Sequence, residues 1–298
     1  MSKRKPTHVS ARRRPRLDGA PARAPRSDKG QAGGASGGAS GGAIWLHGTH
    51  AVMAALANPA RKLRRLLLSE EAERRGGPAL EQALKQALER HPGLEVTRAA
   101  REEIERRLGA GAVHQGLALE VAPLSTGGLE PLLESLPAGR AVVVVLDQVT
   151  DPHNVGAILR SAAVFGAAAV VATERNSAPE SGILAKSASG ALEVVPYLQL
   201  PNLARALDAL KANGFWVLGL ASEEAATLQG ANLPGADLPD RLALCLGAEG
   251  TGLRRLTRER CDFLLSLPAK GAFRDLNVSN AAAVALYELI GRHAATDP

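Results

Sequence analysis

Short apolar runs alternate with amphipathic stretches along most of the chain, a pattern typical of strands that alternate with helices. The continuous apolar runs predict strands over 63–68, 94–97, 116–121, 141–146, 168–172, 193–196, 216–220, 242–246 and 263–267. The stretches with helical periodicity predict helices over 51–58, 79–90, 99–108, 154–165, 182–189, 203–213 and 279–292. This alternation indicates the α/β fold class.

The character of the strands changes along the chain, and this change predicts the domain organisation. Residues 141–146 form an apolar and largely β-branched run, as expected for a central parallel strand that is covered on both faces. We expect a small α/β domain over 43–122, a linker with one short helix over 123–139, and an open α/β domain with a mostly parallel sheet over 140–298. Ligands of such sheets bind beyond the carboxyl ends of the strands.

The basic excess of the chain lies in its first 42 residues. They hold ten Lys and Arg against two Asp, a net charge of +8, whereas the other 256 residues sum to −2 because they hold 26 Lys and Arg against 28 Asp and Glu. Residues 30–42 are nearly all Gly, Ala and Ser, so we expect a disordered tail over 1–42. Two interpretations stay open: an arm with affinity for phosphate backbones, or a solvated tail without a specific partner. A secretory signal is excluded because no apolar segment follows the charges, and a mitochondrial transit peptide is the weaker alternative.

Composition and motif spacing exclude several classes of protein. No apolar run approaches the roughly 20 residues that cross a bilayer, so we expect a soluble protein of the cytoplasm without a membrane partner. Cys245 and Cys261 are expected to be small buried thiols in a reducing compartment. The spacing of glycines, cysteines and histidines matches neither a dinucleotide fingerprint, nor a P-loop, nor a zinc site, and we expect no metal.

The densest basic cluster of the first domain consists of Arg61, Lys62, Arg64 and Arg65. These charges fit either an ordinary solvated face or a face that meets RNA, and the solvated face is the favoured interpretation.

Three polar segments lie next to predicted strands and helices. Residues 151–156 (Asp-Pro-His-Asn-Val-Gly) open a helix, residues 247–252 (Gly-Ala-Glu-Gly-Thr-Gly) leave a buried strand, and residues 276–280 (Leu-Asn-Val-Ser-Asn) precede the last helix. A glycine-rich turn allows backbone N–H groups to approach a bound cofactor closely. We expect Glu249 to be buried in its turn and to face the Asn and Ser cluster, which suggests chemistry rather than packing.

Arg160 lies six residues after Asn154, less than two turns along the same predicted helix. A guanidinium at that place is suited to bind a phosphate through two hydrogen bonds, whereas a surface Arg paired with a carboxylate is the alternative. His153 follows a proline at a turn, and we expect it to stabilise the turn rather than to act as a general base.

These segments resemble a known family. Residues 147–161 resemble the first signature of the SpoU-type RNA ribose 2′-O-methyltransferases, residues 246–253 the second, and Leu267-Pro268 with residues 276–281 the third. The three signatures occur in the family's order, and the resemblance covers about residues 44–298. Residues 47–52, 114–116 and 186–191 are similar to the branch that methylates a guanosine ribose of large-subunit (23S) ribosomal RNA.

The resemblance implies a fold, a cofactor and partners. It implies a catalytic domain with a deep trefoil knot, an RNA-binding domain similar to ribosomal protein L30e, RNA as the substrate, and a homodimer built partly on the C-terminal helix. It also implies S-adenosylmethionine as the cofactor, held by Gly247, Gly250, Leu267 and Leu276. The reacting site is implied to consist of Arg160, Asn154, Glu249, Asn277 and Ser279.

The roles within that site follow partly from chemistry. The family's Arg helps to deprotonate or orient the ribose hydroxyl; because a guanidinium is almost never neutral, orientation, phosphate binding and charge stabilisation are the favoured roles of Arg160. Asn154 is expected to position Arg160 or the ribose, and Glu249, Asn277 and Ser279 to shape the site. This chain departs from the family at Asp275, where Ser is common; its carboxylate could pair with Arg160, accept a proton or face solvent.

Two alternatives remain beside a ribosomal RNA ribose methyltransferase. The same chemistry on transfer RNA is the first, and the L30e-like character of residues 43–122 argues mildly against it. A non-catalytic RNA-binding or ribosome-assembly factor is the second, and the presence of Asn154, Arg160, Glu249 and Asn277 argues against that.

Overall fold

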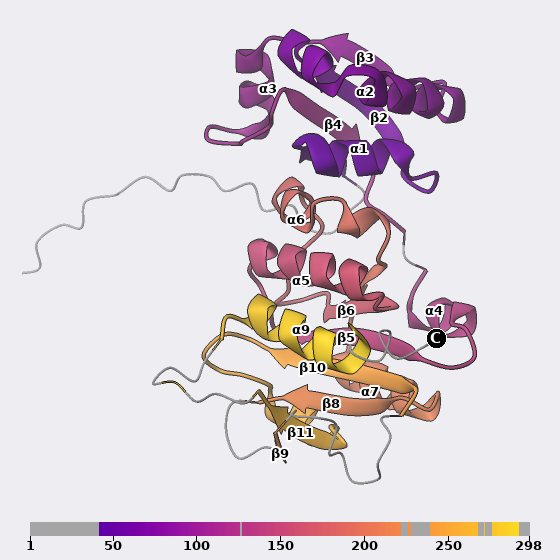
Figure 1. Ribbon diagram of the computed structural model, residues 1–298, viewed down its shortest axis with the longest axis vertical. Helices are drawn as coiled ribbons and strands as arrows, with labels where there is room; N and C mark the ends of the chain where they lie inside the picture. The colour runs from indigo at the N-terminus through magenta and orange to yellow at the C-terminus, as the bar shows by residue number, and fades with distance from the viewer. Residues whose placement is uncertain are drawn as a thin grey trace, which may run out of the picture. The chain divides into compact units, whose positions relative to one another are not determined.

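The structure is a computed structural model, and it describes residues 42–125, 127–221, 226–227, 239–267, 271 and 276–291 (Figure 1). Residues 1–41 of the predicted tail and Asp275 lie outside the described residues.

The first sheet has four strands in the order β1-β4-β2-β3. Its strands are β1 (Ile44–His47), β2 (Leu63–Leu68), β3 (Glu95–Arg98) and β4 (Leu117–Val121). The strand β4 pairs antiparallel with both β1 and β2, whereas β2 and β3 are parallel. The helices of this part are α1 (Thr49–Ala57), α2 (Glu70–Arg90) and α3 (Arg101–Leu108). The strand β1 was not predicted, because four residues before a His-Gly turn give no periodicity to detect.

Helix α2 begins nine residues before the predicted helix over 79–90. The Ser69 hydroxyl accepts a hydrogen bond from the Ala72 N–H, and three glutamates lie in the first turn, where they complement the helix dipole. Gly77 interrupts the helix with a φ of 50° and a ψ of −146°, and Pro78 restarts it. The predicted helix is therefore the second half of a kinked pair.

The second sheet has seven strands in the order β7-β6-β5-β10-β8-β11-β9, and all its pairs are parallel. The strands are β5 (Ala141–Asp147), β6 (Ala169–Thr173), β7 (Tyr197–Leu200), β8 (Trp216–Leu220), β9 (Ala226–Thr227), β10 (Arg241–Gly247) and β11 (Phe263–Ser266). The prediction of a strand over 193–196 was wrong: a 3₁₀ turn, η1 (Ala191–Glu193), precedes β7 there. The strand β9 was not predicted because it has two residues.

The strand β5 is buried along its whole length, as its apolar run predicts. Val142, Val144 and Leu146 pack in one core with α5 (Pro152–Phe165), α6 (Gly182–Ala188) and α9 (Val278–Leu286). The alternate residues Val143 and Val145 pack in a second core with α4 (Leu129–Ser135) and α7 (Leu203–Ala212). The sheet therefore lies between two helical layers.

The last helices bring α5 and the C-terminal segment together. Figure 1 shows α5 and α9 side by side over the sheet, and α9 continues as a π-helical turn, η2 (Tyr287–Gly291). The short helix α8 (Arg255–Arg258), which was not predicted, follows the glycine-rich turn. Within the described ranges, no helix is long and apolar enough to cross a membrane.

The parallel register fixes where the polar segments lie. Gly247 pairs with Asp147, so β10 and β5 end at the same level, and the turn after β10 lies beside the start of α5. Residues 151–156 and 247–252 therefore lie at the same edge of the sheet, beyond the carboxyl ends of its strands.

Candidate functional site

Three residues from three distant segments form a closed triangle of hydrogen bonds at this edge. The Asn154 Nδ2 donates to Glu249 Oε1 at 3.0 Å. The Asn277 Nδ2 donates to the same oxygen at 2.6 Å and to Asn154 Oδ1 at 3.0 Å. Each predicted polar segment thus contributes one side chain to a single cluster.

Asn277 is held in place by its position at the start of α9. Its Oδ1 accepts hydrogen bonds from the Ser279 N–H at 2.9 Å and from the Ser279 hydroxyl at 2.5 Å, which makes Asn277 the N-cap of the helix. Because the oxygen is used for the cap, the amide nitrogen points toward Glu249 and Asn154. Four of the five predicted reacting residues are therefore joined: Asn154, Glu249, Asn277 and Ser279.

The burial predicted for Glu249 was wrong, because its side chain is exposed. The carboxylate nevertheless faces the Asn and Ser cluster as expected. Its hydrogen bonds to the cluster come from the neutral amides of Asn154 and Asn277. A carboxylate held in this way beside solvent can attract a cationic ligand.

Glycine at position 247 is required by the close approach of two backbone segments. A Cβ atom there would lie 2.1 Å from the Gly252 carbonyl carbon and 2.3 Å from the Leu253 nitrogen. The turn folds back on itself through a hydrogen bond of 2.9 Å from the Gly252 N–H to the Ala248 carbonyl oxygen. Gly250 and Gly252 both have positive φ angles, of 81° and 64°. The turn therefore presents backbone rather than side chains.

A buried carboxylate, which the sequence reasoning did not single out, anchors this turn. Asp147 at the end of β5 has no exposed surface. Its carboxylate accepts from the Arg254 N–H at 2.9 Å and from the Arg254 Nε at 2.5 Å. The signal in the sequence was an acidic residue directly after a buried strand, which requires a partner when it is covered.

Arg160 is not brought into contact with the triangle. Its side chain is exposed, and among the described residues it has no hydrogen bond or ion pair to Asn154, Glu249 or Asn277. Arg160 instead lies one turn before Val164, so these two exposed side chains share one face of α5.

His153 is tied to the start of its helix. Its N–H donates to the Asp151 carboxylate at 2.9 Å, which caps α5, and its Nδ1 lies 3.0 Å from the Ser187 hydroxyl of α6. These contacts agree with the expected role of stabilising the turn.

The remaining predicted cofactor residues, Leu267 and Leu276, differ in their exposure. Leu267 follows β11 and packs partly buried against the core. Leu276, directly before Asn277, exposes 53% of its surface. A turn of bare backbone, an exposed leucine and a solvated carboxylate together suit a ligand that has a planar ring, an apolar part and a positive centre. The residues therefore fit a sulfonium cofactor such as S-adenosylmethionine.

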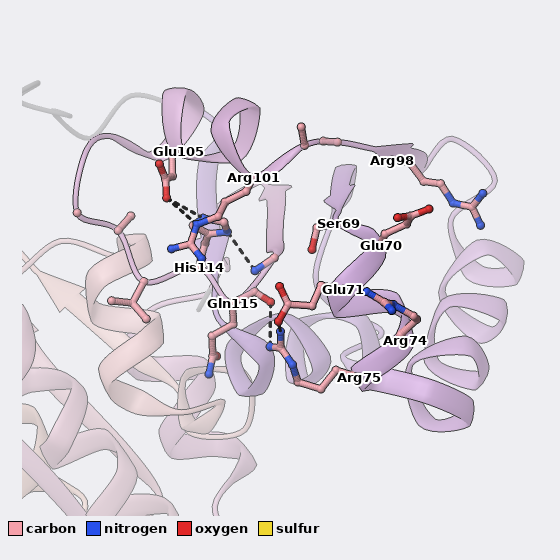
Figure 2. A pocket seen from close by; sticks show the side chains of 16 residues that line it. Ser69, Glu70, Glu71, Arg74, Arg75, Arg98, Arg101, Glu105, His114 and Gln115 are labelled. Carbon is pink, nitrogen blue, oxygen red and sulfur yellow. Dashed lines mark hydrogen bonds and ion pairs between the residues drawn. The ribbon is translucent and has the colours of Figure 1, made fainter.

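A polar groove lies in the part of the chain that forms the first sheet, and its lining residues fall between Ser69 and Gly116. It has a volume of about 750 Å³, and Figure 2 shows four arginines around it: Arg74, Arg75, Arg98 and Arg101. Arg75 pairs with Glu71 at 2.8 Å, and Arg101 pairs with Glu105 at 3.0 Å. His114 also lines the groove; it is buried, and its Nε2 has no hydrogen-bond partner among the described residues. The groove is therefore lined by charged side chains of both signs rather than by apolar ones.

The cysteines and the possible metal ligands add no further chemistry. Cys245 is buried and Cys261 is half-buried, and both are free thiols. Among the residues that the structure describes, no group of three or more His, Cys, Asp or Glu side chains could hold a metal ion.

Two family profiles match the chain in succession. The profile of the RNA 2′-O ribose methyltransferase substrate-binding family matches residues 45–127, and that of the SpoU rRNA Methylase family matches residues 141–287. The chain is 41% identical over 248 residues to the 23S rRNA (guanosine-2′-O-)-methyltransferase RlmB of Pseudomonas putida, and the match covers 82% of this chain and 95% of that protein.

Solved structures share the fold. The SpoU methyltransferase AviRb of Streptomyces viridochromogenes, solved in complex with AdoMet, is similar with a TM-score of 0.69 and 21% identity, over 86% of this chain and 92% of that one. The AdoMet-bound rRNA methyltransferase of Sinorhizobium meliloti is similar with a TM-score of 0.68 and 22% identity, over 84% of this chain and 87% of that one.

Proposed function

The chain belongs to the SpoU rRNA Methylase family, and we propose that it transfers a methyl group from S-adenosylmethionine to the 2′-hydroxyl of a guanosine in large-subunit (23S) ribosomal RNA. The observation that carries the proposal is the triangle of Asn154, Glu249 and Asn277, which unites three family signatures at one edge of a parallel sheet. The RlmB relative, which aligns over nearly its whole length, supports guanosine as the target.

The residues of the site divide between cofactor and substrate. We assign the turn at Gly247 and Gly250, together with Leu267 and Leu276, to the cofactor, which supplies an activated methyl group when bound. The Glu249 carboxylate favours a positive centre beside it, and the two amides hold that carboxylate in place. The hydrogen bond between Asn277 and Ser279 fixes the start of α9, which forms one wall of the site.

The role of Arg160 follows from its exposure. A guanidinium without a partner in the described part of its own chain is available to bind an RNA phosphate and to orient the ribose beside it. Because Arg160 is exposed and makes no hydrogen bond or ion pair to its own triangle among the described residues, we propose that it serves the reacting site of a second copy of the chain.

A homodimer is supported by an apolar face on α5 and its neighbour. Val164, Val284 and Tyr287 are large exposed apolar side chains on the adjoining helical segments α5, α9 and η2. Tyr287 also packs edge-on against Phe165, with ring centroids 6.1 Å apart. An exposed apolar patch of this kind is typical of an interface. A double substitution, Val164→Asp with Tyr287→Asp, should yield monomers in sedimentation, whereas persistent dimers would place the interface elsewhere.

We propose that residues 43–122 form the L30e-like RNA-binding domain and residues 140–298 the knotted catalytic domain. The match to the substrate-binding profile and the arginine-lined groove support RNA contact by the first. The insertion of β10 between β5 and β8 and the tight return of the chain at Gly247 agree with a trefoil knot in the second. Ribosomal RNA as the substrate implies action in the cytoplasm.

Ribose methylation mapped by mass spectrometry in a deletion strain tests the proposal. One 2′-O-methylguanosine of large-subunit ribosomal RNA should disappear, and the wild-type chain but not Asn154→Ala should restore it. Loss of methylation in transfer RNA alone would instead favour the transfer RNA alternative. A ribosome-assembly defect with unchanged methylation would favour a non-catalytic assembly factor.

A further inference from the structure

Arg61 is the largest side chain without any exposed surface in the described part of the chain. It lies in the loop between α1 and β2, within the basic cluster that we expected to be solvated or to meet RNA. Both of those interpretations are wrong for Arg61, because its guanidinium is buried against the second half of the chain.

Two carboxylates from the segment between β6 and β7 hold this guanidinium. The Arg61 Nη2 donates to Glu193 Oε1 at 2.5 Å, and its Nε donates to Glu193 Oε2 at 3.0 Å, so the contact is bidentate. The Nη1 donates to Glu180 Oε1 at 2.5 Å and to the Ala122 carbonyl oxygen at 3.0 Å. Burial by itself would lower the pKa of Arg61, but the hydrogen bond to Glu193 and the charge of both carboxylates raise it above its ordinary value.

The remaining polar atoms of this cluster are also satisfied. The Asn58 Nδ2 donates to Glu193 Oε2 at 2.8 Å, and the Leu124 N–H donates to Glu180 Oε2 at 3.0 Å. Two carboxylates of the catalytic half therefore bind one loop and the following linker of the RNA-binding half. A buried ion cluster with complete hydrogen bonding favours one arrangement of its parts over others, because every displaced arrangement leaves a charge unpaired.

Two glycines at the ends of α6 allow the same two halves to touch closely. A Cβ atom on Gly182 would lie 2.2 Å from the Trp45 carbonyl oxygen of β1. A Cβ atom on Gly190 would lie 2.9 Å from the Ala54 Cβ of α1, and Gly190 also has a φ of 96°. The segment of α6 and η1 is thus seated against the RNA-binding half at both ends.

The opposite side of α6 rests on the helix that carries Asn154. A Cβ atom on Gly156 of α5 would lie 2.4 Å from the Ser187 Cβ, so these two helices are in backbone contact. Ser187 also lies within hydrogen-bond distance of His153. A continuous series of contacts therefore joins Arg61, the segment of α6 and the first turn of α5.

We propose that Arg61, Glu180 and Glu193 form a clamp that makes the α6 segment a rigid spacer, and that this spacer sets which nucleotide of the bound RNA reaches Asn154. This inference rests on the proposed function. The domain of residues 43–122 holds the RNA, and the spacer fixes the distance from this domain to Asn154. That distance decides which nucleotide reaches Asn154. Loss of the clamp should therefore impair delivery of the RNA without altering the cofactor site. Arg61 is accordingly a positioning residue rather than a catalytic one.

Two substitutions in the full-length protein test the clamp. Arg61→Met removes the charge, and Arg61→Lys keeps it but cannot bind two carboxylates through a planar fork. Arg65→Met is the matched control, since Arg65 lies four residues further along, is substantially exposed, and pairs with the exposed Glu95 at 3.0 Å. The measurements are the KM for ribosomal RNA, kcat, the dissociation constant of S-adenosylmethionine, the map of methylated positions, and the radius of gyration from small-angle X-ray scattering.

Both Arg61 variants should lower kcat/KM for ribosomal RNA by between about tenfold and about a hundredfold, because small displacements of a bound reactant have effects of this size on the rate. Methylation should spread to neighbouring nucleotides, the radius of gyration should increase, and cofactor affinity should stay within about twofold of wild type. An unchanged kcat/KM with a single methylated position in Arg61→Lys would overturn the clamp. A parallel loss of cofactor affinity and RNA affinity in both variants would also overturn it, because the cluster would then serve overall stability.

Separate results would contradict the clamp and the proposed function. If the wild-type chain methylates no ribosomal RNA, the proposed function is wrong, and scattering still decides whether the two halves are held together. An unchanged radius of gyration in Arg61→Met would then overturn the clamp.

Discussion

The amide nitrogen of Asn154 donates to the Glu249 carboxylate across 3.0 Å, although 95 residues separate the two in the sequence. The parallel register of β5 and β10 explains the contact, since it brings the ends of both strands to one level. Asn277 then closes the triangle from the start of α9. A site assembled in this way depends on sheet register and on a helix cap rather than on a mobile loop.

Arg160→Ala should lower methyl transfer by at least about a hundredfold, because a positioned charge that acts on the transition state has effects of this size. Cofactor binding should remain within about twofold, since Arg160 does not contact the Asn154–Glu249–Asn277 triangle. Turnover kinetics and calorimetric titration with S-adenosylmethionine measure the two effects. Arg205→Ala, an exposed Arg on α7 beneath the opposite face of the sheet, is the control and should leave both unchanged. A parallel loss of turnover and cofactor affinity in Arg160→Ala would show a structural role instead.

Gly247→Ala should abolish the close return of the turn, because the added Cβ would lie 2.1 Å from the Gly252 carbonyl carbon. We expect a cost of about 1–3 kcal/mol in the free energy of unfolding, typical of overpacking, and a weaker affinity for S-adenosylmethionine. Gly93→Ala is the matched control, since a Cβ there meets nothing within 4 Å. Denaturant unfolding and cofactor titration of both variants check the prediction. Wild-type cofactor affinity in Gly247→Ala would remove this turn from the cofactor site.

The pattern of the sequence predicted most elements of the sheets because their physics is local. The run over 63–68 is a strand with those bounds, and residues 141–146 form most of β5. A continuous apolar run is typical of a strand that is covered on both faces. The wrong prediction of a strand over 193–196 also came from local pattern alone. The pattern cannot distinguish a buried 3₁₀ turn from a strand of similar length, because both cover apolar side chains.

Long-range pairing is what the sequence alone did not reveal. Arg61 is buried because it pairs with Glu180 and Glu193, which lie more than a hundred residues away in the sequence. The basic cluster around Arg61 therefore could not predict its burial. Glu249 was expected to be buried in the turn that leaves an apolar strand. The structure leaves it exposed, two residues after the end of β10.

Removal of residues 1–42 should weaken RNA binding and reduce its dependence on salt. Their net charge of +8 would release counterions from a phosphate backbone, so the slope of log K against log[salt] should become less steep. The methylated position should not change, because the tail carries no residue of the predicted site. Binding measured at several salt concentrations tests this, with a tail of the same length in which the Lys and Arg are replaced by Gln as the control. An unchanged slope would make the tail a solvated segment without a partner.

The stability of the protein should decrease on mild acidification because of His47. Burial, and next to it the positive charge of Lys186, lower the pKa of His47 below the ordinary value of 6.5. His47 therefore binds a proton less readily in the folded chain than in the unfolded chain. Its contribution to the free energy of unfolding is complete above pH 6.5 and is lost as the pH falls toward the lowered pKa. One such group changes the free energy of unfolding by at most about 1.4 kcal/mol per pH unit.

His47→Gln should remove this dependence, since glutamine does not titrate. The contribution of His47 to wild-type stability is lost on acidification, so the variant is expected to be less stable than wild type near neutral pH, and the difference should narrow between about pH 7 and about pH 5. Denaturant unfolding at a series of pH values measures the difference. His50→Gln, which alters an exposed histidine at the start of α1, is the matched control and should follow the wild-type curve. A constant difference between His47→Gln and wild type across this range would show that His47 stays equally protonated in the folded and the unfolded chain, and that its burial contributes by packing alone.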